Sequence, residues 1–137
     1  MRTVFFAIAF AISVTINFAS PAQAEEPAIQ DVITSQIEAF QVDDFVTAFT
    51  YASPTIQNLF GTADNFGRMV SQGYPMVWRP AGVTYLSQRI EGAVVFQDVK
   101  IVDAAGNTHL VEYTMERLEN EWRISGVRIL EAPGASV

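Results

Sequence analysis

The chain of 137 residues contains no cysteine. This absence excludes disulfide bonds, thiolate metal ligands and thiol nucleophiles, so the fold must be held together by packing alone. Basic residues are also scarce, because 8 Lys and Arg stand against 15 Asp and Glu and give a formal net charge of −7. Nucleic acids and anionic lipid head groups are bound through clustered positive charge. We therefore expect neither of them as a partner.

Histidine occurs once, as His109. Without cysteine, the remaining metal ligands would be carboxylates, so we expect no metal site and no cofactor. His109 follows a turn that ends at Asn107 and is predicted to be a surface residue. None of the serines stands in the G-x-S-x-G context of a hydrolase nucleophile. The sequence thus contains no strong catalytic motif.

The first 24 residues have the pattern of an export signal. Arg2 supplies the positive charge, residues 4–16 form an uncharged apolar run, and Ala22-Gln23-Ala24 is a small-x-small cleavage site. The run is shorter than the roughly 20 residues that span a bilayer, and no later segment is apolar enough to do so. We therefore predict a signal peptide over residues 1–24, a periplasmic or secreted protein, and no stable membrane span after cleavage. A retained N-terminal anchor is the alternative.

Residues 25–137 suffice for a single domain, whose ordered part we expect at about 28–131. Apolar residues at helical spacing predict a helix over residues 29–40. Asp43 is placed to cap a second helix, and Ser53-Pro54 begins a short third one that ends at Gly61. Thr62 is expected to cap a fourth helix over residues 64–72. The first half of the domain is therefore predicted to be helical.

Beyond Pro80 the apolar period changes from about 3.6 to 2 residues, and β-branched and aromatic residues become frequent. This pattern predicts four strands, over residues 83–90, 94–102, 108–118 and 122–130. The links between them are short, which implies antiparallel neighbours. We therefore predict an α+β domain in which N-terminal helices pack on one face of a curved antiparallel sheet.

Two segments resemble fold motifs of the nuclear transport factor 2-like superfamily, whose cone-shaped fold is shared with ketosteroid isomerases. They are Phe40-x-x-Asp43-Asp44-Phe45-x-x-Ala48-Phe49-x-x-Ala52-Ser53 and Glu121-Trp122-Arg123-Ile124-Ser125-Gly126-Val127. The resemblance implies a cone-like fold, of the nuclear transport factor 2-like or cystatin-like kind. Many cone-fold proteins insert a strand or hairpin between their second and third helices, where this sequence has only helix and turn signals. A shallower cone is therefore expected.

Residues 66–70, 73–80 and 113–115 further resemble the domain-of-unknown-function 4864 family of small exported bacterial proteins. This likeness extends over essentially the whole predicted mature chain. It implies a fold and an envelope location, and the family has no established activity to transfer.

The second hairpin provides a candidate catalytic pair. If the turn over residues 104–107 sets Asp103 opposite Thr108, then Asp98 lies opposite Tyr113. A carboxylate and a phenol inside the cone resemble in kind the groups that cone-fold isomerases use. The functional interpretation is an isomerase- or dehydratase-type enzyme, with Asp98 as base and Tyr113 as hydrogen-bond donor. In the structural alternative, Tyr113 packs in the core while Asp98 pairs with a cation or meets water.

The segment over residues 74–80 places large apolar side chains between prolines. Tyr74, Met76 and Trp78 are predicted to form a lip over the mouth of the cone, which binds an apolar ligand or partner together with Tyr113 inside. Arg79 would offer its guanidinium group to a carboxylate. The alternative is a bracing crossover whose rings cap the core.

Val99, Ile101 and Leu110 are expected on the other face of the sheet as an apolar strip. A monomer would leave this strip in water, so it predicts an interface. Cone-fold proteins often pair through this face, and the resemblance therefore implies a homodimer. The alternative is a sheet that coils enough, with a bulge at Gly126, to bury the strip itself.

These features favour an exported, non-catalytic module that binds a small apolar ligand or an envelope protein. The enzyme with Asp98 and Tyr113 is the second interpretation, and a purely structural dimer is the third.

Overall fold

The computed structural model describes residues 21–130, with side chains described from Pro27 onward. Most of the predicted signal peptide lies outside these residues, and its predicted cleavage site, after Ala24, falls within the first helix. Export therefore stays a prediction. Among the described residues, no helix combines the length and the apolar character needed to cross a membrane.

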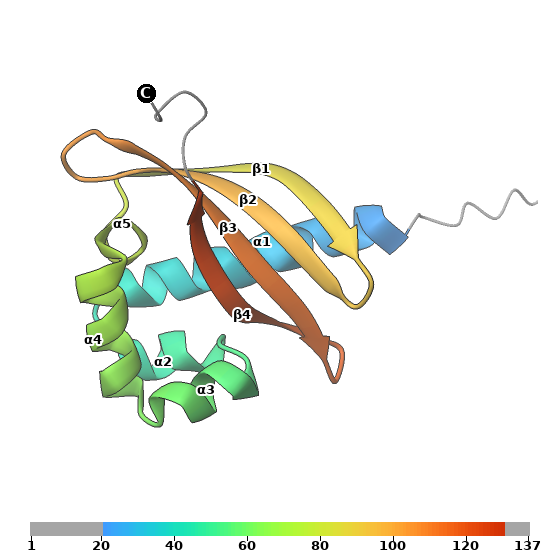
Figure 1. The fold of residues 1–137 in the computed structure, drawn as a ribbon, viewed down its shortest axis with the longest axis horizontal. Helices are drawn as coiled ribbons and strands as arrows, with labels where there is room; N and C mark the ends of the chain where they lie inside the picture. Colours follow the sequence, from blue (N-terminus) through green and yellow to red (C-terminus); the bar gives the residue numbers. More distant parts are fainter. Residues whose placement is uncertain (1–20, 131–137) are drawn as a thin grey trace, which may run out of the picture.

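The described chain has a helical first half and a four-stranded second half (Figure 1). The helices are α1 (Pro21–Gln41), α2 (Phe45–Thr50), α3 (Pro54–Phe60), α4 (Ala63–Gly73) and α5 (Pro75–Trp78). The strands are β1 (Gly82–Glu91), β2 (Val94–Val102), β3 (Thr108–Leu118) and β4 (Glu121–Leu130). The predicted α+β fold is confirmed, and each predicted strand end lies within one residue of the observed one. The single turn of helix in α5 was not predicted.

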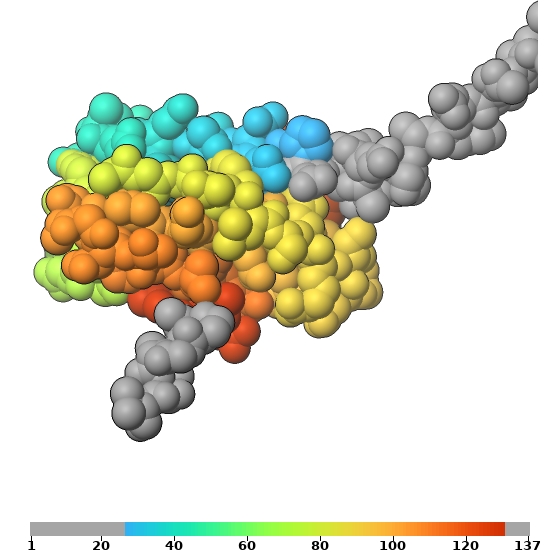
Figure 2. Space-filling model, turned by 90° about the horizontal axis from the view of Figure 1, so that it is seen from above, coloured from blue at the N-terminus to red at the C-terminus, as the bar shows by residue number. Residues whose placement is uncertain are grey.

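The strands form an antiparallel sheet in the order β1-β2-β3-β4. Its register shifts in β1 between Tyr85 and Gln88, and in β4 at Ser125, next to the glycine where a bulge was considered. Bulges bend a strand and increase its twist. The sheet accordingly curves around α1, which runs along one of its faces (Figures 1 and 2).

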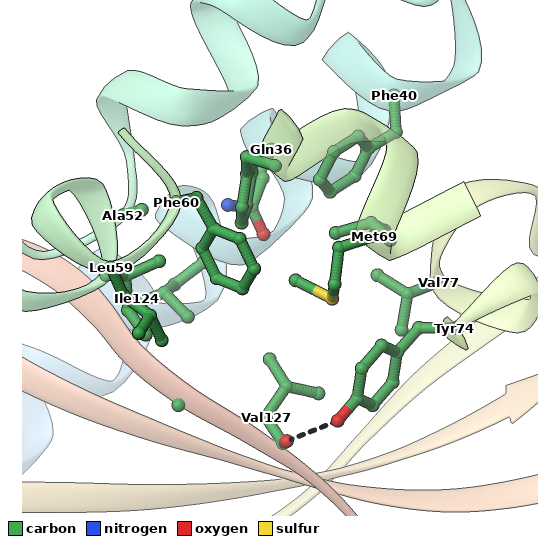
Figure 3. Close-up of a pocket in the computed structure, with 14 residues that line it drawn as sticks. Gln36, Phe40, Ala52, Leu59, Phe60, Met69, Tyr74, Val77, Ile124 and Val127 are labelled. Atoms are coloured by element: carbon green, nitrogen blue, oxygen red, sulfur yellow. Dashed lines mark hydrogen bonds between the residues drawn. The ribbon is translucent and has the colours of Figure 1, made fainter. Parts of the chain in front are cut away.

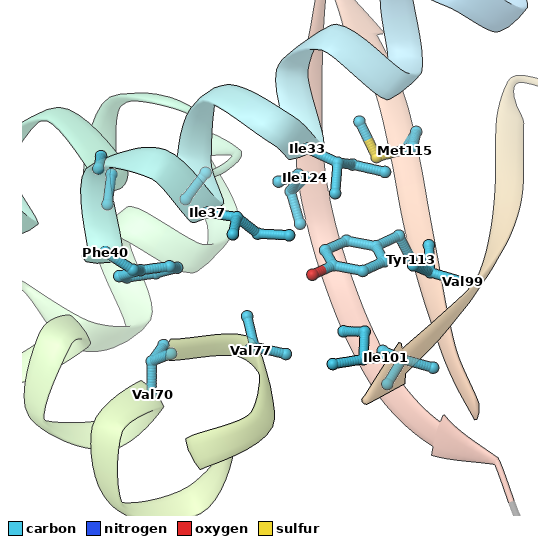
Figure 4. Close-up of a cluster of buried hydrophobic side chains, with 14 of the residues drawn as sticks. Ile33, Ile37, Phe40, Val70, Val77, Val99, Ile101, Tyr113, Met115 and Ile124 are labelled. Carbon is cyan, nitrogen blue, oxygen red and sulfur yellow. The ribbon is translucent and has the colours of Figure 1, made fainter. Parts of the chain in front are cut away.

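The main core lies between α1 and the inner face of the sheet (Figure 4). The large buried apolar side chains of α1 recur every three or four residues and therefore share one side of the helix. They are Ile29, Ile33, Ile37 and Phe40. The sheet faces them with buried side chains of its central strands: Val95, Val99, Ile101, Val111, Tyr113 and Met115. Each such aliphatic side chain contributes about 1.5–3 kcal/mol by leaving water.

The link between α2 and α3 covers the edge of β4. The Ile124 N–H donates to Tyr51 O and the Ser53 N–H donates to Ile124 O, both at 2.8 Å. Ala52 forms an isolated parallel bridge with Ile124 at this point. Among the described residues, the link between α2 and α3 contains this bridge and no strand or hairpin. It holds α3 against β4.

The predicted capping residues are observed, with one exception. Ser53 and Thr62 each accept a hydrogen bond from the backbone N–H three residues later, and Gly61 ends α3 at a φ of 77°. The prediction that Asp43 caps the second helix was wrong, because Asp44 accepts from Thr47 instead. Asp43 takes a positive φ of 55°, which turns its carboxylate toward α5.

Gly67 lies where α4 approaches α2, and a Cβ atom there would overlap the ring of Phe45. We predict that Gly67→Ala destabilises the protein by about 1–3 kcal/mol, because a well-packed contact does not absorb the extra carbon. Gly73→Ala, at a position with open space in the same helix, should instead be neutral or stabilising by up to about 1 kcal/mol. Urea unfolding measures both. Equal stabilisation by the two variants would contradict the close packing of α4 on α2.

Candidate functional site

A cavity of about 230 Å³ opens between the helices and β4 (Figure 3). Its walls come from α1, α3, α4 and α5, from the segments that join them, and from β4. The lining residues are Gln36, Phe40, Ala52, Ile56, Leu59, Phe60, Phe66, Met69, Val70, Tyr74, Val77, Ile124, Gly126 and Val127. We call this cavity the helix–β4 pocket.

Phe66 of α4 stands at the centre of an aromatic cluster that shapes the pocket. Its ring centroid lies 5.8 Å from those of Phe40 and Phe60 and 5.3 Å from that of Phe49. Tilted aromatic pairs at such distances are favourable beyond the area they bury. Met69 and Val70 follow Phe66 at helical spacing and therefore lie on the same side of α4. The local sequence of α4 thus builds one apolar wall.

The pocket has a buried inner end and an accessible mouth. Gln36, Phe40 and Val77 are buried at its inner end, whereas the Leu59 side chain at the mouth is 72% exposed. The asymmetry gives a ligand a way in.

Two side chains bring polar atoms into the otherwise apolar lining. The Gln36 amide nitrogen donates to Ala48 O at 3.1 Å. The Tyr74 hydroxyl donates to Val127 O at 3.5 Å (Figure 3). The lining therefore presents no ionised group to a ligand at neutral pH.

The structure brings only one of the predicted lip residues to the pocket. Tyr74 lines it, whereas Met76 is buried against the core with 7% of its surface exposed. Tyr113, expected inside the cone, is fully buried behind the pocket and does not line it.

Trp78 and Arg79 bind Asp43 instead of facing the pocket. Both the Trp78 indole nitrogen and an Arg79 guanidinium nitrogen donate to Asp43 Oδ1 at 2.9 Å. Arg79 also donates to Phe40 O, and its guanidinium carbon lies 4.0 Å from the centroid of the Trp78 ring. These bonds lower the pKa of Asp43, the bond from Trp78 most of all. The guanidinium group of Arg79 is thus already paired within the chain.

The predicted register of the second hairpin was wrong by one residue. Val102 pairs with Thr108, so Gln97 lies opposite Tyr113, and Asp98 lies opposite Glu112. A shift of one residue moves a side chain to the other face of the sheet. Asp98 and Tyr113 therefore point away from each other and cannot act on one ligand atom, which removes the basis of the enzyme interpretation.

The Asp103 side chain explains the register. Its Oδ1 accepts from the backbone N–H groups of Ala105 and Asn107, both at 2.9 Å, and this closes a loop that includes Asp103 itself. Its Oδ2 lies 2.7 Å from His109 Nε2. The bond to His109 is the main cause that lowers the pKa of Asp103. The sequence analysis missed this pair, because it placed Asp103 opposite Thr108 and began the turn at residue 104.

Tyr113 has a hydroxyl oxygen that finds no hydrogen-bond partner within residues 21–130. Burial raises the pKa of Tyr113 far above its usual range, with a smaller contribution from Tyr85. Tyr113 therefore stays neutral, and Figure 4 shows its ring packed among core side chains such as Ile37 and Val77.

Asp98 lies on the outer face of the sheet beside the buried carboxylate of Glu112. Glu112 is paired with Arg128 at 3.0 Å and with Arg89 at 3.6 Å. One Asp98 carboxylate oxygen is buried without a partner among the described residues. Within those residues, no group of three or more His, Asp or Glu side chains is arranged to hold a metal ion.

The predicted apolar strip does not exist as an exposed surface. Val99 and Ile101 are fully buried on the inner face against the chain's own core, whereas Leu110 lies on the outer face opposite Lys100. The one-residue register error is again the cause, because Val99 and Ile101 belong to the inner face and do not share a face with Leu110. The expected homodimer therefore loses this surface and stays a prediction.

Residues 22–137 match the family described as a domain of unknown function, DUF4864. The chain belongs to this family. The fold is similar to that of an NTF-2 like protein of unknown function from Shewanella oneidensis, at 12% identity and a TM-score of 0.55, over 78% of this chain and 99% of that one. It is also similar to a SEC-C motif containing protein from Rhodopseudomonas palustris, at 13% identity and a TM-score of 0.53, over 73% and 77% of the two chains. Comparison with curated proteins gives no match.

These likenesses confirm the predicted nuclear transport factor 2-like fold and the family membership. At such identities they concern the fold alone.

We predict that Asp43→Asn lowers the thermal unfolding midpoint at neutral pH, because the amide keeps an acceptor for Trp78 but loses the charge that Arg79 pairs with. The folded-state pKa of Asp43 lies below its ordinary value of 3.8. The stabilisation is therefore complete above that value and is lost as the pH falls through the lower folded-state pKa. Midpoints of wild type and variant, measured from pH 7 downward, should converge in acid. A difference that does not depend on pH would rule out the charge as its cause.

We also predict that Tyr113→Phe leaves stability unchanged or raises it by up to about 1–2 kcal/mol, since it removes a buried hydroxyl without a partner. Tyr85→Phe is the matched control, because the Tyr85 hydroxyl donates to Gln30 O at 3.1 Å and bonds Thr34 Oγ1 at 2.5 Å. That variant should lose about 1 kcal/mol. Urea unfolding compares the two, and equal losses would mean that the Tyr113 hydroxyl is satisfied.

Proposed function

We propose that the protein is an exported, non-catalytic module that binds a small apolar ligand in the helix–β4 pocket. The observation that carries the proposal is the pocket itself, an apolar cavity of about 230 Å³ with a buried inner end and an exposed side chain at its mouth. Apolar cavities with a few polar groups are the usual binding sites of small molecules, and this one is smaller than most of them.

The volume limits the size of the ligand. A dry cavity of about 150 Å³ lined by aliphatic and aromatic side chains accommodates benzene. The helix–β4 pocket is larger, at about 230 Å³, and by proportion it accommodates roughly nine or ten non-hydrogen atoms. A fused bicyclic ring system matches this size.

The chemistry of the lining supports binding rather than catalysis. General acid-base catalysis needs a group whose pKa lies near the working pH. The lining residues contain no carboxylate, imidazole or amine, and the two polar side chains among them are an amide and a phenol. The pocket can desolvate and orient a ligand, and the hydroxyl hydrogen of its phenol, Tyr74, is already directed to Val127 O.

Export, and the alternative of a protein partner or a second copy, come from the sequence analysis. The signal-like pattern of residues 1–24 supports export. A protein partner or a second copy would have to cover the mouth near Leu59 instead of filling the pocket. The following experiment separates a ligand inside the pocket from a partner over it.

The bicyclic hydrocarbon indene is a suitable probe, and Val127→Phe is the variant that fills the pocket. Val127 lines the pocket and its side chain points into it (Figure 3). We predict that wild type binds indene and that Val127→Phe weakens binding by about tenfold or more, which corresponds to about 1.4 kcal/mol. Isothermal titration calorimetry measures the affinities.

Ile129→Phe is the matched control, because Ile129 lies on the same strand, is 45% exposed and does not line the pocket. It should bind indene as wild type does. Absence of binding by wild type, or equal weakening in both variants, would refute the proposed site.

A further inference from the structure

The amide of Gln36 is a polar group placed among apolar neighbours. It lies on the buried side of α1, between Ile33 and Phe40, and the residue is 3% exposed. Its position lines the inner end of the helix–β4 pocket. A polar side chain at such a place needs partners, because its desolvation is otherwise not compensated.

The hydrogen bond to α2 decides which atom of the amide faces the pocket. Ala48 O is a carbonyl oxygen and can only accept, so the amide nitrogen of Gln36 must face it, and the distance is 3.1 Å. The amide oxygen, Oε1, is therefore the atom left over. Figure 3 shows it directed into the space between Phe40 and Phe60. Among the described side chains and backbone, the hydrogen bond to Ala48 O is the only one that the Gln36 side chain makes. Oε1 is not one of the fully enclosed atoms without a partner, so a donor in the pocket can reach it.

The Tyr74 hydroxyl, the other polar side-chain group of the lining, does not donate to Gln36 Oε1. The Tyr74 hydroxyl hydrogen is directed to Val127 O, so it is not offered to Gln36. The pocket thus presents an unpaired acceptor at its buried end and apolar surface over most of the rest.

We propose that the ligand of this pocket is a neutral, compact ring compound that carries a hydrogen-bond donor, of the indole or phenol class, and that its N–H or O–H group donates to Gln36 Oε1. This inference rests on the proposed function and specifies the ligand. A carboxylate would meet an acceptor rather than a cation, and a pure hydrocarbon would leave the acceptor unpaired. The size of the cavity and the four aromatic side chains in its wall fit a bicyclic aromatic ring.

Indole and indene form a matched pair of probes. They have nearly the same shape, and indole has a ring N–H where indene has a CH₂ group. The greater apolarity of indene affects its affinity for every variant alike. The informative quantity is therefore the ratio of the indene to the indole dissociation constant, compared between variants.

Gln36→Leu removes the acceptor, and Gln57→Leu is the matched control. The Gln57 amide also donates to backbone carbonyls, to Phe49 O at 3.0 Å and Ala52 O at 3.1 Å, but it does not line the pocket. We expect the ratio to fall by about tenfold in Gln36→Leu and to stay within twofold of wild type in Gln57→Leu. Isothermal titration calorimetry gives all the dissociation constants.

A crystal structure of wild type soaked with indole tests the same contact without a variant. The indole nitrogen should lie within about 2.7–3.2 Å of Gln36 Oε1. An indole nitrogen directed elsewhere, or an unchanged ratio in Gln36→Leu, would overturn the inference while leaving the pocket as a binding site. If wild type bound neither probe, the proposed function would fail as well.

Discussion

The packing of α1 against the curved sheet is the contact on which the rest of the structure depends. Its buried isoleucines contact the central strands, and the bends at the bulges of β1 and β4 shape the sheet around the helix. Near the C-terminal end of α1, the short helices touch the sheet at a few points, such as the Ala52 bridge to β4, and do not fill all the space against this strand. The helix–β4 pocket is thus a consequence of how α1 is covered.

The segment between α4 and β1 makes two kinds of contact, with the pocket and with Asp43. Val77 and Tyr74 face the pocket, while Trp78 and Arg79 hold Asp43 at the end of α1. The same short stretch therefore lines the site and fixes its position against the first helix. An aromatic residue beside a binding site need not contact the ligand, because its task can be to keep the wall in place.

The fold was largely readable from the sequence, and the site was not. The change of apolar period from about 3.6 to 2 residues at Pro80 separated helices from strands, and the turn residues between the strands located their ends to within one residue. The face of Asp98 depended on whether Asp103 belongs to the strand or the loop, which a side-chain bond to the turn decides. The Trp78 and Arg79 contacts join segments far apart in sequence, which no local pattern contains. The sequence does contain a signal for Gln36, because it is a polar residue on the apolar side of the first helix.

The helix–β4 pocket is built from two chain segments far apart in sequence, and this determines when the pocket forms during synthesis and folding. Gln36 is supplied by the first helix and Val127 by the last strand, which is held in place by its edge contact with Ala52. A nascent chain that has not yet released β4 has only one half of the cavity. A ligand can therefore bind only after the fold is complete, and a pocket that holds a ligand indicates a fully folded chain.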